Sequence, residues 1–195
     1  MMKRITVFCG SNNGADPEYK AQAYKLGQIL AQNSIELVYG GAYVGLMGAV
    51  ADGVLEWGGN VIGIIPSFLQ KKELAHTGLS EMIIVDTMHQ RKAKMEELCD
   101  GIIALPGGFG TLDELFEILT WAQLSLHNKP TGILNTNGFY NTLLKFVDEM
   151  VVQNFVKGEY RDLLLVNENP DNLIKQMKSY VPPLNDKWFV TNMNQ

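Results

Sequence analysis

A glycine-rich segment joined to an acidic residue is the part of this sequence that points most clearly to chemistry. It reads Leu105-Pro106-Gly107-Gly108-Phe109-Gly110-Thr111-Leu112-Asp113-Glu114. The apolar run 101–105 predicts a buried strand, and the apolar periodicity of 112–119 predicts a helix that packs back on it. Glycines at such a junction permit positive φ and leave backbone N–H groups uncovered. At the positive end of a helix dipole, this arrangement suits a phosphate.

Thr111 and Glu114 stand at the start of this predicted helix and allow two interpretations. Thr111 can cap the first turn or donate its hydroxyl to the anion, and Glu114, one turn later, points toward whatever the loop holds. The same Thr-x-x-Glu spacing is that of a capping box, in which the glutamate reaches back to a backbone N–H. The loop alone does not decide, because it is neither a Walker loop nor a dinucleotide fingerprint.

A second segment, Met88-His89-Gln90-Arg91-Lys92-Ala93-Lys94-Met95, follows the strand-like run 82–85 and begins a helix that leads to Cys99. Arg91 offers a planar fork and Lys92 a mobile point charge, so the pair can hold a phosphate together with a hydroxyl or carboxylate. Taken alone, the segment can equally be a solvated basic helix face.

Together, the Met-x-x-Arg-Lys and Pro-Gly-Gly-x-Gly-Thr-x-x-Glu patterns resemble the LOG family of cytokinin riboside 5′-monophosphate phosphoribohydrolases, many of which were once labelled lysine decarboxylases. The resemblance spans roughly residues 1–155 and includes the segments 39–48, 61–66 and 120–124. The chain departs from the family pattern at Ala42, where a third consecutive glycine is usual. This change adds a methyl group near the expected nucleotide crevice.

The resemblance implies hydrolysis of the N-glycosidic bond of adenosine 5′-monophosphates, N6-substituted or plain, to a free base (cytokinin or adenine) and ribose 5-phosphate. It makes Arg91 and Glu114 the catalytic residues. The cleavage develops positive charge on the ribose, which a carboxylate stabilises while it orients or deprotonates the attacking water. We expect the Arg91 guanidinium to hold Glu114 ionised and to position ribose hydroxyls or the leaving base.

The expected substrate contacts come partly from the motifs and partly from the resemblance, which adds Glu73 and Thr120. We expect Lys92 and the loop 107–111 to hold the 5′-phosphate. The complete set is Gly10, Ser11, Gly40, Gly41, Glu73, Met88, Arg91, Lys92, Gly107, Gly108, Phe109, Gly110, Thr111, Leu112, Asp113 and Thr120. No metal or redox cofactor is needed for this reaction.

Two other functions stay open. One is a non-catalytic nucleotide or cofactor carrier, because related folds resemble molybdenum-cofactor carrier proteins; the presence of both Arg91 and Glu114 argues against it. The other is a general AMP nucleosidase. The sequence does not separate prenylated from plain adenine, since ordinary apolar side chains such as those around Met88 and Phe109 would line a pocket for an N6 substituent.

Alternation of short apolar runs with helical patterns indicates the fold class. Strands are expected near 5–9, 35–39, 61–65, 82–85, 102–105, 131–134 and 163–166. This order predicts an α/β, Rossmann-like, three-layer fold with a mostly parallel sheet and helices on both faces. Ligands of such sheets bind beyond the carboxyl ends of the strands, where every candidate segment lies. We expect one nucleotide-binding catalytic domain over 1–180 and a C-terminal arm or tail over 181–195.

Composition narrows the function classes. The 195 residues are 46% hydrophobic, enough for one core, and the net charge of −5 with no Lys/Arg block argues against a nucleic-acid partner. Cys9 and Cys99 have neither disulfide nor zinc-site spacing, which favours the cytoplasm. His76, His89 and His127 lack the spacing of a metal site. No run approaches the length of a membrane span or a signal sequence.

The predicted helix 112–126 carries an apolar arc wider than one sheet face needs to cover. Surplus apolar surface usually marks a subunit contact, which predicts a homodimer. The family resemblance implies the same, with helices beside the active site packed across a two-fold axis and a partner's side chains near the substrate. The alternative is that the arc is enclosed between the sheet and a C-terminal helix over 170–180.

Overall fold

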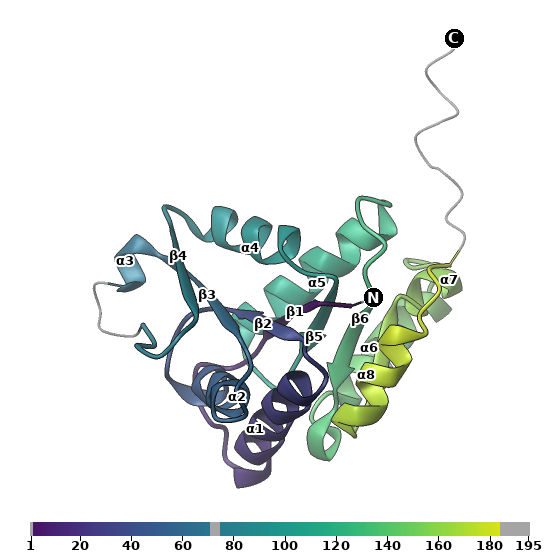
Figure 1. The fold of residues 1–195 in the computed structure, drawn as a ribbon. Coiled ribbons are helices and arrows are strands. Elements are labelled where there is room, and N and C mark those ends of the chain that lie inside the picture. The colour runs from purple at the N-terminus through teal and green to yellow at the C-terminus, as the bar shows by residue number, and fades with distance from the viewer. Residues whose placement is uncertain (1, 71–74, 184–195) are drawn as a thin grey trace.

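Seven parallel strands form one continuous sheet in the computed structural model, which describes residues 2–70 and 75–183 (Figure 1). The strand order is β4-β3-β2-β1-β5-β6-β7, and every neighbouring pair is parallel. The strands are β1 (Arg4–Phe8), β2 (Glu36–Tyr39), β3 (Val61–Pro66), β4 (Glu81–Val85), β5 (Gly101–Ala104), β6 (Thr131–Leu134) and β7 (Leu164–Asn167). The expected fold class is confirmed, and each strand begins and ends within one residue of its predicted position.

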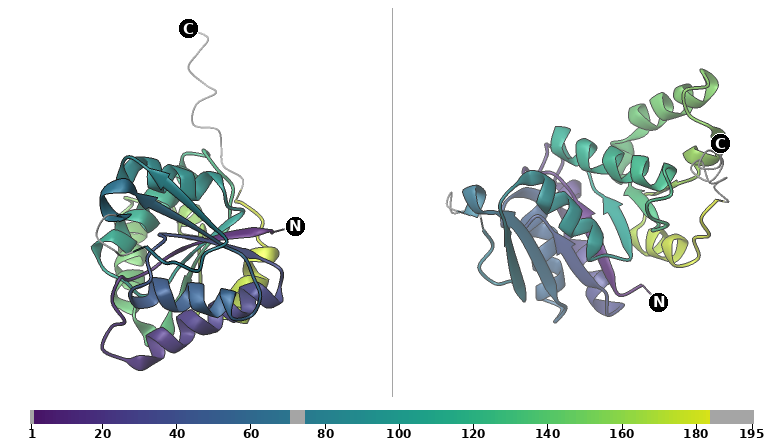
Figure 2. Two further views of the ribbon diagram at one scale, coloured as in Figure 1. Left: turned by 60° about the vertical axis from the view of Figure 1, so that its left-hand side comes forward. Right: turned by 90° about the horizontal axis from the view of Figure 1, so that it is seen from above.

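Helices cover both faces of the sheet and make three layers (Figures 1 and 2). The helices α1 (Pro17–Gln32), α2 (Gly45–Leu55) and α8 (Pro170–Lys178) pack in one core cluster on one face. The helices α4 (Met88–Glu97), α5 (Phe109–Gln123) and α6 (Asn141–Val152) pack on the other. Short turns of helix complete the described chain: α3 (Ser67–Gln70), η1 (Thr136–Gly138) and α7 (Gly158–Arg161).

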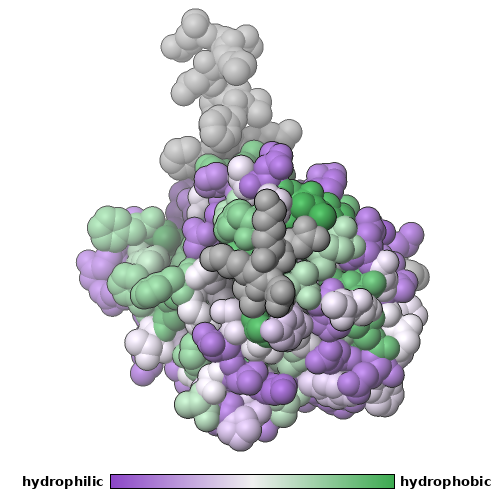
Figure 3. All heavy atoms as spheres, turned by 90° about the vertical axis from the view of Figure 1, so that its left-hand side faces the viewer, coloured by the Kyte–Doolittle hydropathy of each residue, from purple (hydrophilic) through white to green (hydrophobic). Residues whose placement is uncertain are grey.

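Burial on both faces explains why the central strands are continuous apolar runs rather than alternating ones. All residues of β3, β5 and β6 are buried. Parallel sheets require this composition because crossover helices cover each face. At the edge formed by β4, by contrast, Ile84 and the nearby Phe68 are about half exposed. Figure 3, which views this side of the molecule, shows apolar and polar residues mixed on its surface.

The strand order creates a crevice between the ends of β1 and β5. From β1 the chain continues to β2 on one side, whereas from β5 it continues to β6 on the other. The two connections therefore diverge, and the space between them is where ligands of open α/β sheets bind. The Gly10 N–H donates to the Pro106 carbonyl at 3.0 Å, which ties the two loops together at the floor of this crevice.

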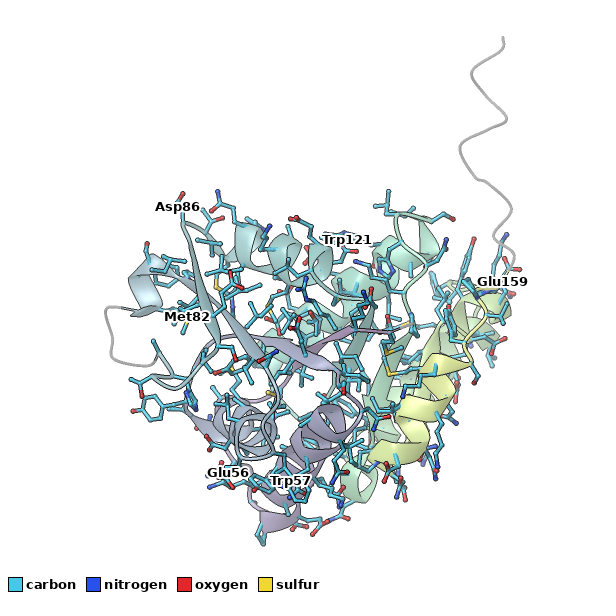
Figure 4. All side chains as sticks on the ribbon, viewed as in Figure 1. Glu56, Trp57, Met82, Asp86, Trp121 and Glu159 are labelled. Carbon is cyan, nitrogen blue, oxygen red and sulfur yellow. The ribbon has the colours of Figure 1, made fainter. Side chains whose placement is uncertain are left out.

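The apolar arc of α5 is not enclosed by α8, so that alternative is wrong. The two helices lie on opposite faces of the sheet because α8 packs against α1, β6 and β7. Instead, α6 and α7 cover part of the arc, including Leu115 and Ala122. Leu124 and Leu126 remain exposed. Trp121 lies on this α5 side, whereas Trp57 lies at the end of α2 on the other face (Figure 4).

The segment predicted as a C-terminal arm falls mostly outside the described residues. Only 181–183 are described, and they lie beyond α8 without helix or strand. Between residues 2 and 183, apart from the gap at 71–74, no helix has the length and apolarity needed to cross a bilayer.

A buried hydrogen bond next to the crevice provides a test of this packing. The Tyr140 hydroxyl donates to the Leu105 carbonyl at 2.6 Å. We expect Tyr140→Phe to lower the free energy of unfolding by about 1–2 kcal/mol, because it leaves a buried carbonyl without a partner. Urea denaturation measures the change. The matched control is Tyr24→Phe, which removes an exposed hydroxyl bound to Glu56 and should have a much smaller effect.

Candidate active site

A cleft of about 600 Å³ occupies the crevice between β1 and β5. Loops after β1, β2, β5 and β6 line it, together with side chains of α4 and α5. Of the expected site residues, eleven line this cleft: Gly10, Ser11, Gly40, Met88, Arg91, Gly107, Gly108, Phe109, Gly110, Thr111 and Glu114. Segments far apart in the sequence thus meet at one place, as expected for the carboxyl edge of a parallel sheet.

Arg91 reaches the cleft from the first turn of α4. A capping box fixes the start of that helix: the Thr87 hydroxyl accepts from the Gln90 N–H, and the Gln90 side chain accepts from the Thr87 N–H. The Arg91 Nε donates to the Ile64 carbonyl at 3.1 Å. The guanidinium also passes directly over Gly40, where a Cβ atom would overlap it. The glycine at this position is therefore needed for close approach.

Glu114 faces Arg91 from α5. Arg91 Nη1 and Glu114 Oε1 are 3.8 Å apart, and each side chain is 11% exposed. Burial raises the pKa of Glu114 to about 7, although the Arg91 charge acts in the opposite direction. The expectation that Arg91 keeps Glu114 ionised thus holds only in part, because burial outweighs the ion pair. The carboxyl group titrates near neutral pH, which is a favourable range for a group that gives up and takes up protons.

The glycine-rich loop leads directly into α5, which begins before Thr111. Gly108 is the N-cap and no side chain caps the helix, so Thr111 and Glu114 do not form a capping box. The first bond within the helix runs from the Leu112 N–H to the Gly108 carbonyl. The N–H groups at 109–111 therefore have no carbonyl partner within the helix and are available to an anion.

The glycines of this loop permit positive φ, but the loop does not use that freedom. None of Gly107, Gly108 and Gly110 is among the described residues with positive φ. Their lack of a side chain matters for a different reason. A Cβ at Gly107 would overlap the Thr111 hydroxyl, whereas Gly108 and Gly110 face open space on the cleft side of the helix end. Gly107 thus allows close packing against Thr111, whereas Gly108 and Gly110 leave the N-terminus of the helix accessible.

Five expected site residues lie outside the cleft lining, and a sixth is not described. Lys92 binds Asp113 and Glu117 instead of facing the cleft. Leu112 packs against the cluster beneath α6, and the exposed Thr120 donates its hydroxyl to the Phe116 carbonyl. Gly41 adopts a φ of +75° and its carbonyl accepts from the His76 N–H. Glu73 lies outside the described residues.

Ala42, the departure from the family pattern, does not reach the cleft. It is 7% exposed and pairs with Ala75 in an isolated antiparallel bridge. Its φ is not positive, whereas that of the preceding Gly41 is. Ala42 is therefore buried at this bridge and is not among the residues that line the cleft.

The cleft also contains residues that sequence reasoning missed: Asn12, Asn13, Gly14, Tyr19, Leu46, Met47, Met95 and Phe139. Asn12 and Asn13 follow β1, and Phe139 follows β6, so the rule that ligands bind beyond the carboxyl ends of strands would have found them. Tyr19 packs edge-to-face on Phe139, with ring centroids 5.7 Å apart. No local sequence pattern predicts this contact, because the two residues are distant in the chain.

Cys9 and His127 have structural rather than chemical roles. Burial and the nearby Glu114 raise the pKa of the Cys9 thiol far above neutrality, so it is no nucleophile. His127 Nε2 lies 3.0 Å from the Ile118 carbonyl, which makes it a packing residue, and burial lowers its pKa. Among the described residues, no group of three His, Cys, Asp or Glu side chains is arranged to hold a metal.

The fold and the cleft define a Rossmann-like α/β protein with its site at the switch point of the sheet. A family model described as "Possible lysine decarboxylase" matches residues 47–177. Cytokinin riboside 5′-monophosphate phosphoribohydrolase LOG7 of Arabidopsis thaliana is 45% identical over 94% of this chain and 85% of its own, and LOG2 of the same plant is 44% identical over 98% and 89%. The chain belongs to this LOG family.

Solved structures with the same fold include molybdenum-cofactor proteins. The molybdenum cofactor binding protein of Rippkaea orientalis is 25% identical, with a TM-score of 0.69 over 92% of this chain and 97% of its own. The Moco carrier protein of Chlamydomonas reinhardtii is 21% identical, with a TM-score of 0.70 over 91% and 96%. These likenesses concern the fold, which many functions share.

The raised pKa of Glu114 predicts a pH-dependent cost in stability. A buried carboxyl that titrates near 7 favours the folded state when protonated, and this contribution is lost as the pH rises from the ordinary glutamate range through 7. At pH 8 we expect Glu114→Gln to unfold with a free energy higher than wild type by up to about 3 kcal/mol. The gain should vanish at pH 4. Denaturant titrations at both pH values test this, and an equal difference at both would contradict it.

Proposed function

We propose that this protein hydrolyses the N-glycosidic bond of cytokinin riboside 5′-monophosphates and releases a free base and ribose 5-phosphate. The observation that carries the proposal is the buried Glu114 carboxyl opposite Arg91, about one helical turn from the uncovered N–H groups that begin α5. The names of the curated relatives, which match nearly the whole chain, support the same activity.

In the proposed complex, the 5′-phosphate lies at the start of α5. The N–H groups of 109–111 and the helix dipole attract it, while Gly108 and Gly110 leave room for its approach. Binding the phosphate at this remote point places the ribose over Glu114. The remaining contacts proposed for the nucleotide are with Gly10, Ser11, Gly40 and Met88, which line the same cleft. Such anchoring lowers the entropy lost in reaching the transition state.

Glu114 then acts on the reacting carbon in its ionised form. As the bond between the base and C1′ breaks, the electron pair leaves with the base and positive charge develops on the ribose. The carboxylate stabilises that charge and accepts a proton from the water whose oxygen attacks C1′. The leaving base finally takes up that proton. Arg91, held by the Ile64 carbonyl, donates hydrogen bonds to the ribose hydroxyls or the base.

The two alternatives differ in what the cleft does with a nucleotide. A carrier would bind the nucleotide and leave it unchanged. The likeness to cofactor carriers concerns the fold, which does not by itself imply a carrier function. The Arg91–Glu114 pair favours cleavage instead. A general AMP nucleosidase would cleave plain AMP as fast as N6-isopentenyl-AMP.

We also propose that residues 1–180 act as one catalytic domain, because a single sheet carries every described part of the cleft. The free thiols of Cys9 and Cys99 suit a reducing cytoplasm.

Product analysis tests the proposed reaction. We expect N6-isopentenyl-AMP to yield the free base and ribose 5-phosphate, and the matching nucleoside to react far more slowly because it lacks the phosphate that the start of α5 holds. Chromatography of the products decides the matter. Release of inorganic phosphate and a nucleoside would mean that the protein is a phosphatase, and an unchanged nucleotide would favour a carrier.

The role of Glu114 is tested in the same assay. Glu114→Gln keeps the shape of the side chain but not its charge, so kcat should fall about 100-fold or more while calorimetry still detects nucleotide binding. The matched control is Glu97→Gln, an exposed residue of α4 paired with Lys94 outside the cleft, which should keep wild-type turnover. Comparable kcat values for the two variants would remove Glu114 from the mechanism.

We also propose a homodimer formed through the end of α5. Leu124 is 39% and Leu126 is 68% exposed, next to the part of the arc that α6 and α7 cover. Such a surface usually contacts another subunit.

Light scattering should give a mass near twice the 21.7 kDa of the chain. The double variant Leu124→Ser with Leu126→Ser should shift the mass toward the monomer, because it removes apolar contact area. Trp57→Ser, a change to an exposed apolar residue on the opposite face of the sheet, is the control (Figure 4). A wild-type mass of 21.7 kDa at high protein concentration would reject the dimer.

A further inference from the structure

A cluster of charged side chains adjoins the catalytic pair between α4 and α5. Lys92 follows Arg91 on α4, and its Nζ lies 3.0 Å from Asp113 Oδ2 and 2.9 Å from Glu117 Oε2 on α5. The Lys92 side chain is only 10% exposed. Adjacent residues of a helix point about 100° apart, so Lys92 faces α5 when Arg91 faces the cleft. A phosphate in the cleft would have to compete with two carboxylates for this ammonium.

We propose that Lys92 is a positioning residue, whose ammonium offsets the charges of Asp113 and Glu117 and so keeps the neighbouring Glu114 in its working ionisation state. This role rests on the proposed function, in which Glu114 acts as a carboxylate. It differs from the role expected from the sequence, where Lys92 holds the 5′-phosphate.

The charges around Glu114 come from three elements, and their signs support this role. Arg91 and Lys92 on α4 lower the pKa of Glu114, whereas burial and the carboxylates of Asp113 and Glu117 on α5 raise it. Cys9, at the end of β1, stays a neutral thiol. Burial lowers the pKa of Lys92 itself, but its hydrogen bonds with Glu117 and Asp113 outweigh this effect and raise it, so Lys92 remains charged.

Removal of the Lys92 charge should therefore leave two uncompensated carboxylates beside Glu114. The pKa of Glu114 would then rise further, and less of the enzyme would hold the ionised carboxylate at neutral pH. Loss of the Asp113 charge should have the opposite effect. Because the Asp113 side chain is 65% exposed, solvent screens it and the shift should be smaller.

The pH dependence of kcat/KM for N6-isopentenyl-AMP tests the proposal. In Lys92→Met the acidic limb of the profile should move up by about one pH unit, and in Asp113→Asn it should move down by less. The double variant, Lys92→Met with Asp113→Asn, has the wild-type sum of charges and should return toward the wild-type profile. If Lys92 only tied α4 to α5, the double variant would be impaired at least as much as Lys92→Met, with no return of the limb.

A second readout does not depend on turnover. Carbon NMR of protein labelled at the glutamate carboxyl carbons follows the titration of Glu114, whose signal is assigned from its absence in Glu114→Gln. The midpoint should shift in the same directions as the kinetic limb. If it does so in a protein that cleaves no nucleotide, the proposed function fails while the charge balance stands.

Two results would overturn the proposal. One is a Glu114 midpoint that is the same in Lys92→Met as in wild type. The other is a KM that rises equally at every pH in Lys92→Met, with an unmoved acidic limb, which would make Lys92 a phosphate ligand. If Lys92→Met does not fold, Asp113→Asn alone decides: its largely exposed side chain tolerates the change, and an unmoved midpoint would contradict the charge balance.

Discussion

A carboxyl group held almost out of water is the constraint on which the site depends. An isolated buried carboxylate is costly, and proteins either pair it or keep it protonated. Glu114 lies between these outcomes, because Arg91 is near enough to attract it but at 3.8 Å is too far to donate a normal hydrogen bond. The guanidinium and the carboxylate thus keep bonding capacity for a group placed between them. If the two groups were closer, they would hydrogen-bond to each other and leave fewer donors and acceptors for a substrate.

The fold maintains that separation by holding the two side chains independently. Arg91 is fixed by the carbonyl of Ile64 within β3 and by the space above Gly40 after β2. Glu114 is fixed by α5, whose start is set by the loop after β5. Three strands and two helices therefore determine one distance. Because helices pack against both faces of a parallel sheet whose central strands are fully buried, none of these elements can shift alone without opening the core.

The same architecture in molybdenum-cofactor proteins shows how little the fold alone says about chemistry. An uncovered helix start beside a crevice suits any phosphorylated ligand. In this chain, two features add more: a carboxyl group that titrates near neutral pH, and a charge cluster of Lys92, Asp113 and Glu117 next to it. The raised pKa follows from the burial of Glu114, and the charge cluster from side chains that reach across between α4 and α5.

The sequence by itself determined the strands, their parallel arrangement and the two motifs that meet at the cleft. Apolar runs and glycine-rich junctions are local signals, so β3 and the loop before α5 were predictable, as was the placement of Arg91 and Glu114 at one edge of the sheet. Only the tertiary structure decided which way each side chain points. It turned Lys92 to α5, placed α8 across the sheet from α5, and excluded the capping box at Thr111 by starting the helix at Phe109. These outcomes depend on contacts between segments distant in the chain, and no local spacing encodes such contacts.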